Sequence, residues 1–277
     1  MLPTFYVLGA QKAGTTWLFS TLSTHPEVGH ATLKEVHYFD RAYRVKKGLK
    51  WYEKQFEKRS ENYGKKAVGD FTPKYLRMVH PECVSNNSAV PTDAMELLKA
   101  ATPDAKFVVI LRNPVRRALS AYQHYLRKGT IAIDTSILDT APDLDLLLAG
   151  RYAEQLEIWF KHFPREQFLI LIYEDDVNPD SMKAETFKRV CNFIGVDDSF
   201  TSENLYDKFN HIVNPFRTRL LNRGGITRRL FWDAPMWIQN LEIWDIKIDE
   251  QEVAALRDYY REPNQKLAEL LGRELPW

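Results

Sequence analysis

One short segment constrains the fold of this chain more than any other. It reads Gly9-Ala10-Gln11-Lys12-Ala13-Gly14-Thr15-Thr16-Trp17 and joins an apolar run at 5–8 to a helical pattern at 15–23. Two glycines let the backbone N–H groups turn inward, and the start of a helix adds unpaired donors and a partial positive charge. The segment therefore predicts an anion-binding loop between a buried strand and a helix, with Lys12 as its full charge. An ordinary glycine turn with Lys12 in solvent is the alternative.

The loop differs from a Walker A motif in the position of its lysine. A Walker A lysine follows the second glycine directly, and in this chain Thr15 occupies that position. Lys12 stands earlier in the loop and is expected to touch a group other than the γ-phosphate of ATP. No acidic strand end indicates a Mg²⁺ ligand, so no metal is expected. A P-loop nucleotide kinase is therefore the alternative hypothesis.

Further apolar runs alternate with helical patterns along the first two thirds of the chain. Strands are predicted at 66–69, 107–111 and 168–173, and helices at 92–101, 115–127 and 152–163. This alternation is typical of a P-loop-like, three-layer α/β fold in which helices flank a central parallel sheet.

The remaining segments are predicted to be helices or loops. The C-terminal part is expected to be helical, at 181–194, 217–229 and 250–271, with the last helix interrupted by Pro263. Asp249 and Glu252 resemble a capping box at its start. The segments 41–59 and 81–91 are predicted to be insertions or surface loops. Residues 1–277 are expected to form a single domain.

Composition limits the partners of the chain. The 38 Lys and Arg residues nearly balance 37 Asp and Glu, giving a net charge of +1, so no global field attracts nucleic acid or an acidic membrane. No apolar run approaches the ~20 residues of a membrane span. Cys83 and Cys191 allow at most one bridge, and the N-terminus lacks a basic signal-peptide region. The sequence thus favours a cytoplasmic protein; it does not indicate an oligomeric state.

A second anion anchor is predicted where the central strand ends, in Leu111-Arg112-Asn113-Pro114. Ligands of parallel sheets lie at the carboxyl ends of strands. Arg112 can form two hydrogen bonds to a phosphate, and Ser120 in the following helix can donate to the same group. Arg116 and Arg117 are expected to be a solvated helix face.

Together, the two anchors resemble those of the sulfotransferases that use 3′-phosphoadenosine 5′-phosphosulfate (PAPS). The first is similar to the family's 5′-phosphosulfate loop, and 108–120 is similar to its 3′-phosphate segment. Lys34-Glu35-Val36-His37-Tyr38-Phe39-Asp40, Thr72-Pro73-Lys74-Tyr75 and Tyr259-Tyr260-Arg261-Glu262-Pro263-Asn264 extend the resemblance to the heparan sulfate glucosaminyl sulfotransferase branch and its bacterial relatives.

The resemblance implies a role for each matching residue. Catalysis would involve Lys12 at the leaving oxygen and Glu35 as general base, with a pKa raised by burial, and His37 is the rival base. A surface ion pair between Glu35 and Lys34 is the alternative for Glu35. The residues implied in PAPS binding are Gln11, Lys12, Ala13, Gly14, Thr15, Thr16, Trp17, Arg112, Ser120, Arg217 and Arg219.

The sequence departs from the resembled branch in two places. Phe71 stands where those enzymes often carry a lysine, for which Lys74 is a candidate replacement, and their C-terminal cysteine pair is absent. Arg217 and Arg219 occupy a segment similar to one that closes over PAPS in bacterial relatives. We therefore expect sulfonate transfer from PAPS to a hydroxyl or amine of a carbohydrate or small-molecule acceptor, releasing adenosine 3′,5′-bisphosphate (PAP). A PAP-binding protein without turnover is the other alternative.

Overall fold

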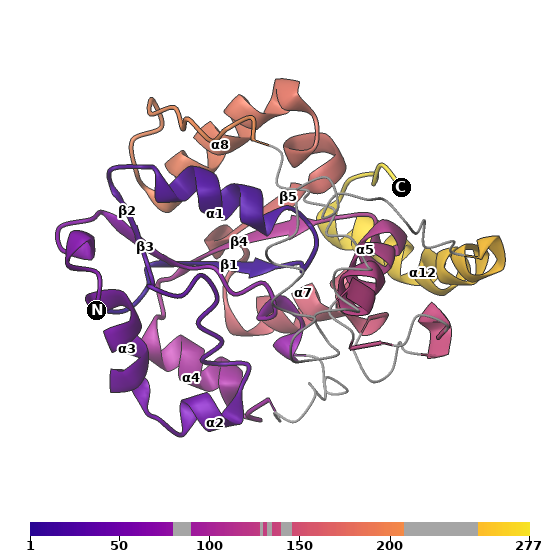
Figure 1. The fold of residues 1–277 in the computed structure, drawn as a ribbon, viewed down its shortest axis with the longest axis horizontal. Coiled ribbons are helices and arrows are strands. Elements are labelled where there is room, and N and C mark those ends of the chain that lie inside the picture. The colour runs from indigo at the N-terminus through magenta and orange to yellow at the C-terminus, as the bar shows by residue number, and fades with distance from the viewer. Residues whose placement is uncertain (80–89, 128–129, 132–134, 140–145, 208–248) are drawn as a thin grey trace, which may run out of the picture.

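A five-stranded, all-parallel sheet forms the centre of the computed structural model (Figure 1). The structure describes residues 1–79, 90–127, 130–131, 135–139, 146–207 and 249–277. The strands are β1 (Phe5–Gly9), β2 (Val28–His30), β3 (Ala67–Asp70), β4 (Lys106–Leu111) and β5 (Phe168–Ile172), in the order β2-β3-β1-β4-β5. The strands predicted from apolar runs are all present.

Strand β2 was not predicted because it is a three-residue edge strand containing a glycine. Its pairing with β3 is supported by Asn62, whose side chain accepts from the N–H of His30 and donates to its carbonyl. A Cβ on Gly29 would lie 2.6 Å from Asn62 Oδ1. Tertiary contacts, and not local periodicity, therefore determine this strand.

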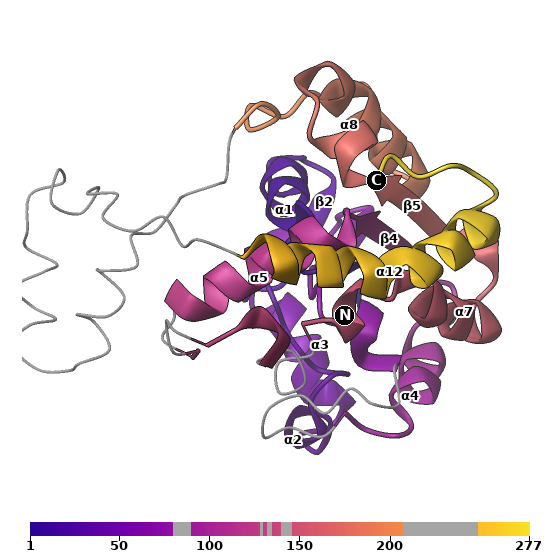
Figure 2. The same ribbon diagram turned by 90° about the vertical axis from the view of Figure 1, so that its right-hand side faces the viewer.

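Helices cover both faces of the sheet, as Figures 1 and 2 show. One face carries α1 (Thr15–Ser23) and α8 (Asp180–Ile194), and the other carries α3 (Leu49–Glu57), α4 (Ala94–Ala101) and α7 (Tyr152–His162). The remaining helices are α2 (Ala42–Val45), α5 (Pro114–Arg127) and α12 (Glu250–Leu271), the last of which packs on α5 and α7. This arrangement confirms the three-layer α/β fold. None of the described helices is long and apolar enough to cross a bilayer.

Aromatic side chains fill the core between β1, β4 and α7. The ring of Phe107 lies 5.8 Å from Tyr6, 5.3 Å from Trp159 and 4.7 Å from Phe163. Trp159 satisfies its indole N–H by donating to the carbonyl of Leu76 at 3.0 Å. The central strands are thus buried on both faces, as their apolar sequences require.

The segment 41–59, predicted to be a surface loop, contains α2 and α3 instead. Tyr52 and Phe56 are four residues apart, so they share one face of α3, and both are fully buried. The Tyr52 ring stacks on Tyr38 at 4.6 Å. The prediction was wrong because charged residues between these two aromatics conceal a one-sided apolar pattern.

Three expectations about the helices also need correction. Helix α12 runs unbroken through Pro263, because burial of Leu256, Pro263 and Leu267 against the rest of the protein offsets the lost hydrogen bond. Asp249 caps α12 by accepting from Gln251 N at 2.9 Å. Glu252, however, accepts from the N–H of Ile137 at 3.1 Å, outside the capping-box pattern.

The third correction concerns Arg117, which was expected in solvent. It is fully buried and donates to the carbonyl of Leu146. Arg116 is exposed, as predicted. The helix predicted at 217–229, residues 81–89 of the loop predicted at 81–91, and Cys83 lie outside the described residues. Cys191 is a free, buried cysteine.

The burial of Phe56 predicts a large stability effect. Replacing Phe56 by Ala is expected to lower the free energy of unfolding by about 3–5 kcal/mol, because it leaves a cavity in the core. Tyr63 is 64% exposed, so the control Tyr63→Ala should change it by less than about 0.5 kcal/mol. Urea denaturation of both variants measures the difference, and equal effects would contradict the packing of α3.

Candidate functional site

The order of the strands brings the two predicted anion anchors together. Strands β2 and β3 lie on one side of β1, and β4 and β5 lie on the other, so the order in which strands are added to the sheet reverses between β1 and β4. Ligands of α/β sheets bind at such a reversal, beyond the carboxyl ends of the strands. Here Arg112, just after β4, donates to the carbonyl of Lys12, just after β1, at 2.9 Å.

Gly14 shapes the loop at the start of α1. It adopts a left-handed conformation with φ of 94°, and no side chain caps the helix that follows. A Cβ at this position would meet the Tyr173 ring and Val177 at 3.1 Å. Only glycine satisfies both requirements, and the uncapped first turn leaves its N–H groups for an anion.

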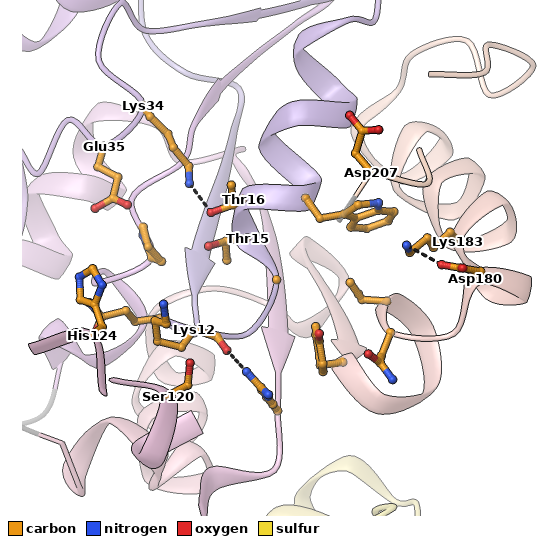
Figure 3. Close-up of a pocket in the computed structure, with 18 residues that line it drawn as sticks. Lys12, Thr15, Thr16, Lys34, Glu35, Ser120, His124, Asp180, Lys183 and Asp207 are labelled. Atoms are coloured by element: carbon orange, nitrogen blue, oxygen red, sulfur yellow. Dashed lines mark hydrogen bonds and ion pairs between the residues drawn. The ribbon is translucent and has the colours of Figure 1, made fainter. Parts of the chain in front are cut away.

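A cavity of about 650 Å³ lies over these two loops (Figure 3). It contains most of the residues that the sequence singled out: Gln11, Lys12, Gly14, Thr15, Thr16, Trp17, Glu35, Arg112 and Ser120. Lys34, Pro73, His124, Tyr173, Val177, Asn178, Asp180, Lys183 and Asp207 complete its lining. Arg217 and Arg219 lie outside the described residues.

Two predicted residues do not line this cavity. Ala13 is fully buried, and its N–H donates to the carbonyl of Ala10 at 3.1 Å, closing the turn of the loop. His37 is buried behind Glu35. Within the described residues these positions therefore support the loop and the carboxylate from behind.

Arg112 is held in place by groups that leave part of its guanidinium without a partner. Its carbonyl accepts from Tyr152 at 2.8 Å, the next N–H donates to Glu174 at 3.1 Å, and the guanidinium lies 4.8 Å from the centre of the Tyr173 ring. Its Nε is buried and has no hydrogen-bond partner among the described residues. A buried, unpaired guanidinium N–H beside a cavity is what an anionic ligand would satisfy.

Trp17 also lines the cavity, and a hydrogen bond fixes it there. It is almost completely buried, and its indole N–H donates to the carbonyl of Leu205 at 2.8 Å. Lys183 lies nearby on α8, is 6% exposed and forms an ion pair with Asp180 at 2.7 Å. The lining of the cavity therefore combines a fixed aromatic side chain with charged side chains of α8.

Glu35, His37 and Asp40 form a chain of hydrogen bonds at the mouth of the cavity. His37 Nε2 lies 3.1 Å from Glu35 Oε2, and Nδ1 lies 2.8 Å from Asp40 Oδ2. Burial raises the pKa of the Glu35 carboxyl, but the hydrogen bond and charge of His37, with Lys34 and Lys74, bring this pKa below its ordinary value. The expectation of a raised pKa was wrong, because the hydrogen bond and charge of His37 and the charges of the two lysines together outweigh the effect of burial.

His37 shows the opposite shift. Burial lowers the pKa of its imidazole, whereas the hydrogen bonds to Asp40 and Glu35 raise it, and the net pKa lies above the ordinary value. With both ring nitrogens on carboxylates, His37 fixes the orientation of Glu35. The alternative of an ion pair between Glu35 and Lys34 is not what the structure shows, since Lys34 donates to Thr16 Oγ1 at 2.8 Å.

Asp70, at the end of β3, holds the backbone that carries Glu35 and His37. Its buried carboxylate accepts from Tyr52 at 2.7 Å, Thr72 at 2.6 Å and Tyr75 at 3.1 Å. Two of these hydroxyls accept in turn from this backbone, Thr72 from Val36 N at 3.0 Å and Tyr75 from Tyr38 N at 2.8 Å. Asp70 is therefore the centre of a polar network beneath the candidate base.

Several residues of the cavity were not predicted, because tertiary packing places them there. Lys183 carried a signal: it shares the buried face of α8 with Thr186 and Phe187, where a lysine is unusual. His124 lies one turn after Ser120 on α5, which also makes it predictable. Asp207, in a segment without a motif, carried none.

Phe71 occupies the position at which enzymes of the heparan sulfate branch often carry a lysine, and here it is a core residue. Its ring packs edge-on against Phe5 and Phe19, at 5.6 Å and 5.1 Å. Lys74, the candidate replacement, is half-buried, and it does not line the cavity described above. Lys34 does line it, and its ammonium lies 5.6 Å from the Phe19 ring.

The sequence and the fold of the chain are both similar to those of known proteins. Residues 2–214 match the sulfotransferase domain family. The whole chain is 28% identical over 292 residues to heparan sulfate glucosamine 3-O-sulfotransferase 3A1 of Mus musculus, of which it spans 64%. It is 36% identical over 367 residues to the membrane-associated sulfotransferase kil1 of Dictyostelium discoideum, of which it spans 66%. The sulfotransferase from Alicyclobacillus acidocaldarius has the same fold, with a TM-score of 0.68, 20% identity and coverage of 99% of this chain and 98% of that one.

The network around Asp70 predicts a pH-dependent stability. Burial raises the pKa of this carboxyl to about 6 from 3.8, more than the hydrogen bonds from its neighbours lower it. Its stabilising contribution is therefore complete below about pH 4 and declines by about 3 kcal/mol as the pH rises through about 6. In Asp70→Asn this decline should be absent, so the difference in unfolding free energy between wild type and variant should shrink from pH 4 to pH 7. Urea denaturation across this range tests it, and a constant difference would contradict the shifted pKa.

Proposed function

The chain belongs to the sulfotransferase family, and from this premise we propose that it transfers a sulfonate group from PAPS to an acceptor, releasing PAP. The main support for the proposal is that the two anion loops lie in contact. Arg112 donates a hydrogen bond to the Lys12 carbonyl, beside the cavity that both residues line. An ATP-dependent kinase would instead need the lysine after Gly14. PAPS, when bound, supplies the sulfonate group and a phosphate leaving group.

The donor side of the cavity fits the two charged ends of PAPS. Lys12 and the uncapped first turn of α1 would bind the 5′-phosphosulfate. Lys12 would also stabilise the negative charge that develops on the leaving oxygen. Arg112 and Ser120 would hold the 3′-phosphate, which supplies a partner for the unpaired Arg112 Nε. Trp17 would provide an apolar surface for the adenine.

On the acceptor side, Glu35 would take the proton of the attacking hydroxyl or amine. Its pKa lies below the ordinary value, so the carboxylate is ionised and ready to accept at neutral pH. A weak base is sufficient if the proton leaves late, when the bond from the acceptor to sulfur has begun to form and the acceptor has become more acidic. His37 would keep Glu35 aligned through the bond at 3.1 Å.

A carbohydrate is the acceptor class that we propose. The basis is the similarity to a relative named as a heparan sulfate glucosamine 3-O-sulfotransferase. Phe71 is buried in the core, where the resembled branch often has a lysine, which argues against heparan sulfate itself as the acceptor. The single domain over 1–277 and the cytoplasmic location expected from the sequence stay predictions.

Incubation with radiolabelled PAPS and a panel of acceptors tests the proposal. The panel should contain desulfated glycosaminoglycan oligosaccharides, neutral glycosides, phenols and simple amines. Transfer of label to a carbohydrate is the expected result. PAP binding without transfer to any of these acceptors would instead indicate a PAP-binding protein without turnover.

Lys12→Ala is expected to reduce turnover far more than PAP affinity. Removing one stabilising group from a transition-state oxygen costs about 100- to 1,000-fold in kcat, whereas PAP lacks the sulfonate and keeps the backbone donors of the loop. Steady-state kinetics and calorimetry on the same preparation measure the two losses. Equal losses would exclude a special role for Lys12 at the leaving oxygen.

Glu35→Gln is expected to leave PAP affinity unchanged and to lower kcat by about 100-fold or more, as for the loss of a general base. The amide keeps the shape of the side chain and can still contact His37. Turnover near that of the wild type would transfer the role of base to His37, and His37→Asn would then be the inactive variant.

A further inference from the structure

Lys34 is a charged side chain of the cavity to which the mechanism above gives no role. It lies directly before Glu35, and its ammonium reaches across the mouth of the cavity to Thr16 on α1, as Figure 3 shows. It thus connects the segment that carries the candidate base with the loop that carries the donor anion. In the described part of the chain, no other lysine lining the cavity is adjacent to Glu35.

The surroundings of Lys34 fix its ammonium while leaving hydrogen-bonding capacity. The ammonium donates to Thr16 Oγ1 at 2.8 Å and lies 5.6 Å from the centre of the Phe19 ring. Phe19 is itself held by Phe71, at 5.1 Å, and by His30, at 5.0 Å. An ammonium has three N–H donors, so donation to Thr16 leaves donors for a ligand in the cavity.

The charge of Lys34 is also less solvated than that of a surface lysine. Burial lowers the pKa of its ammonium, and the neighbouring Glu35 carboxylate partly restores it. A partly desolvated cation interacts more strongly with an anion that enters the cavity than a fully hydrated one does.

We propose that Lys34 is a catalytic residue of the transfer proposed above, on which this inference rests, and that it contacts the nonbridging oxygens of the moving sulfonate group. In the reaction the bond between sulfur and the 5′-phosphate oxygen breaks, and its electron pair stays on that oxygen. A new bond forms between sulfur and the acceptor atom, whose proton passes to Glu35. Lys34 donates hydrogen bonds throughout and exchanges no proton, so it holds the group in line between Lys12 and Glu35.

This role separates Lys34 from Lys12 by the atoms that each contacts. Lys12, within the phosphate loop, is placed at the leaving oxygen, whereas Lys34, from the acceptor side, contacts oxygens that only PAPS carries. Lys34 should therefore distinguish PAPS from PAP. A lysine with a purely structural role, keeping Thr16 in place, would affect the binding of both nucleotides equally.

Lys34→Gln with Lys74→Gln as a matched control tests the proposal. Both lysines are half-buried and lower the pKa of Glu35 by their charge, but Lys74 does not line the cavity. We expect Lys34→Gln to keep the PAP affinity of the wild type, to weaken PAPS binding by about tenfold and to lower kcat by about 100-fold. Lys74→Gln should stay within about fivefold of the wild type, and Lys34→Arg should recover part of the lost activity.

Calorimetry with PAP and PAPS and steady-state transfer kinetics provide the readouts. Equal loss of PAP and PAPS affinity, or a kcat for Lys34→Gln near that of the wild type, would overturn the role of Lys34 while leaving the proposed function intact. Equal kinetic effects of the two variants would show that only the charge near Glu35 matters, which also overturns it. Absence of transfer by the wild type would refute the proposed function and, with it, this inference.

Discussion

Strand β1 pairs in parallel with β4, and this pairing brings the two anion loops of the site together. The pairing register shifts between Val7 and Gly9, directly before the anion loop, so the end of β1 departs from regular strand geometry. The same pairing places Arg112 against the Lys12 carbonyl at 2.9 Å. Two segments about a hundred residues apart in sequence thereby become one binding surface, and each helps to fix the other.

The acceptor side is built on a different principle, a buried polar network. Asp70 accepts hydrogen bonds from three hydroxyl groups, and two of these hydroxyl groups accept hydrogen bonds from backbone N–H groups of 36–38. His37, within that segment, adopts a left-handed φ of 52° and directs its ring between Glu35 and Asp40. This conformation costs free energy in a residue other than glycine, so it requires the surrounding hydrogen bonds. The network thereby stabilises the arrangement that aligns Glu35 with the donor loop.

Much of this architecture could be predicted from the sequence, because the decisive signals are local. The strand, glycine loop and helix at 5–23, and the Arg112 segment after a β-branched strand, indicated the carboxyl end of the central strands, where the cavity lies. The direction of the Glu35 pKa shift could not be predicted, since it depends on His37 lying 3.1 Å away. Strand β2, the burial of Arg117 and the inward position of Lys183 likewise depend on packing between distant segments.

The proposed function requires the cavity over β1 and β4 to bind an adenosine bisphosphate without a metal ion. This requirement can be tested by calorimetric titration of the metal-free protein with PAP, beside a titration with ATP and Mg²⁺. We expect micromolar or tighter binding of PAP and little response to ATP. Preference for ATP with Mg²⁺ would contradict it, because Lys12 would then be acting as a kinase lysine despite its early position in the loop.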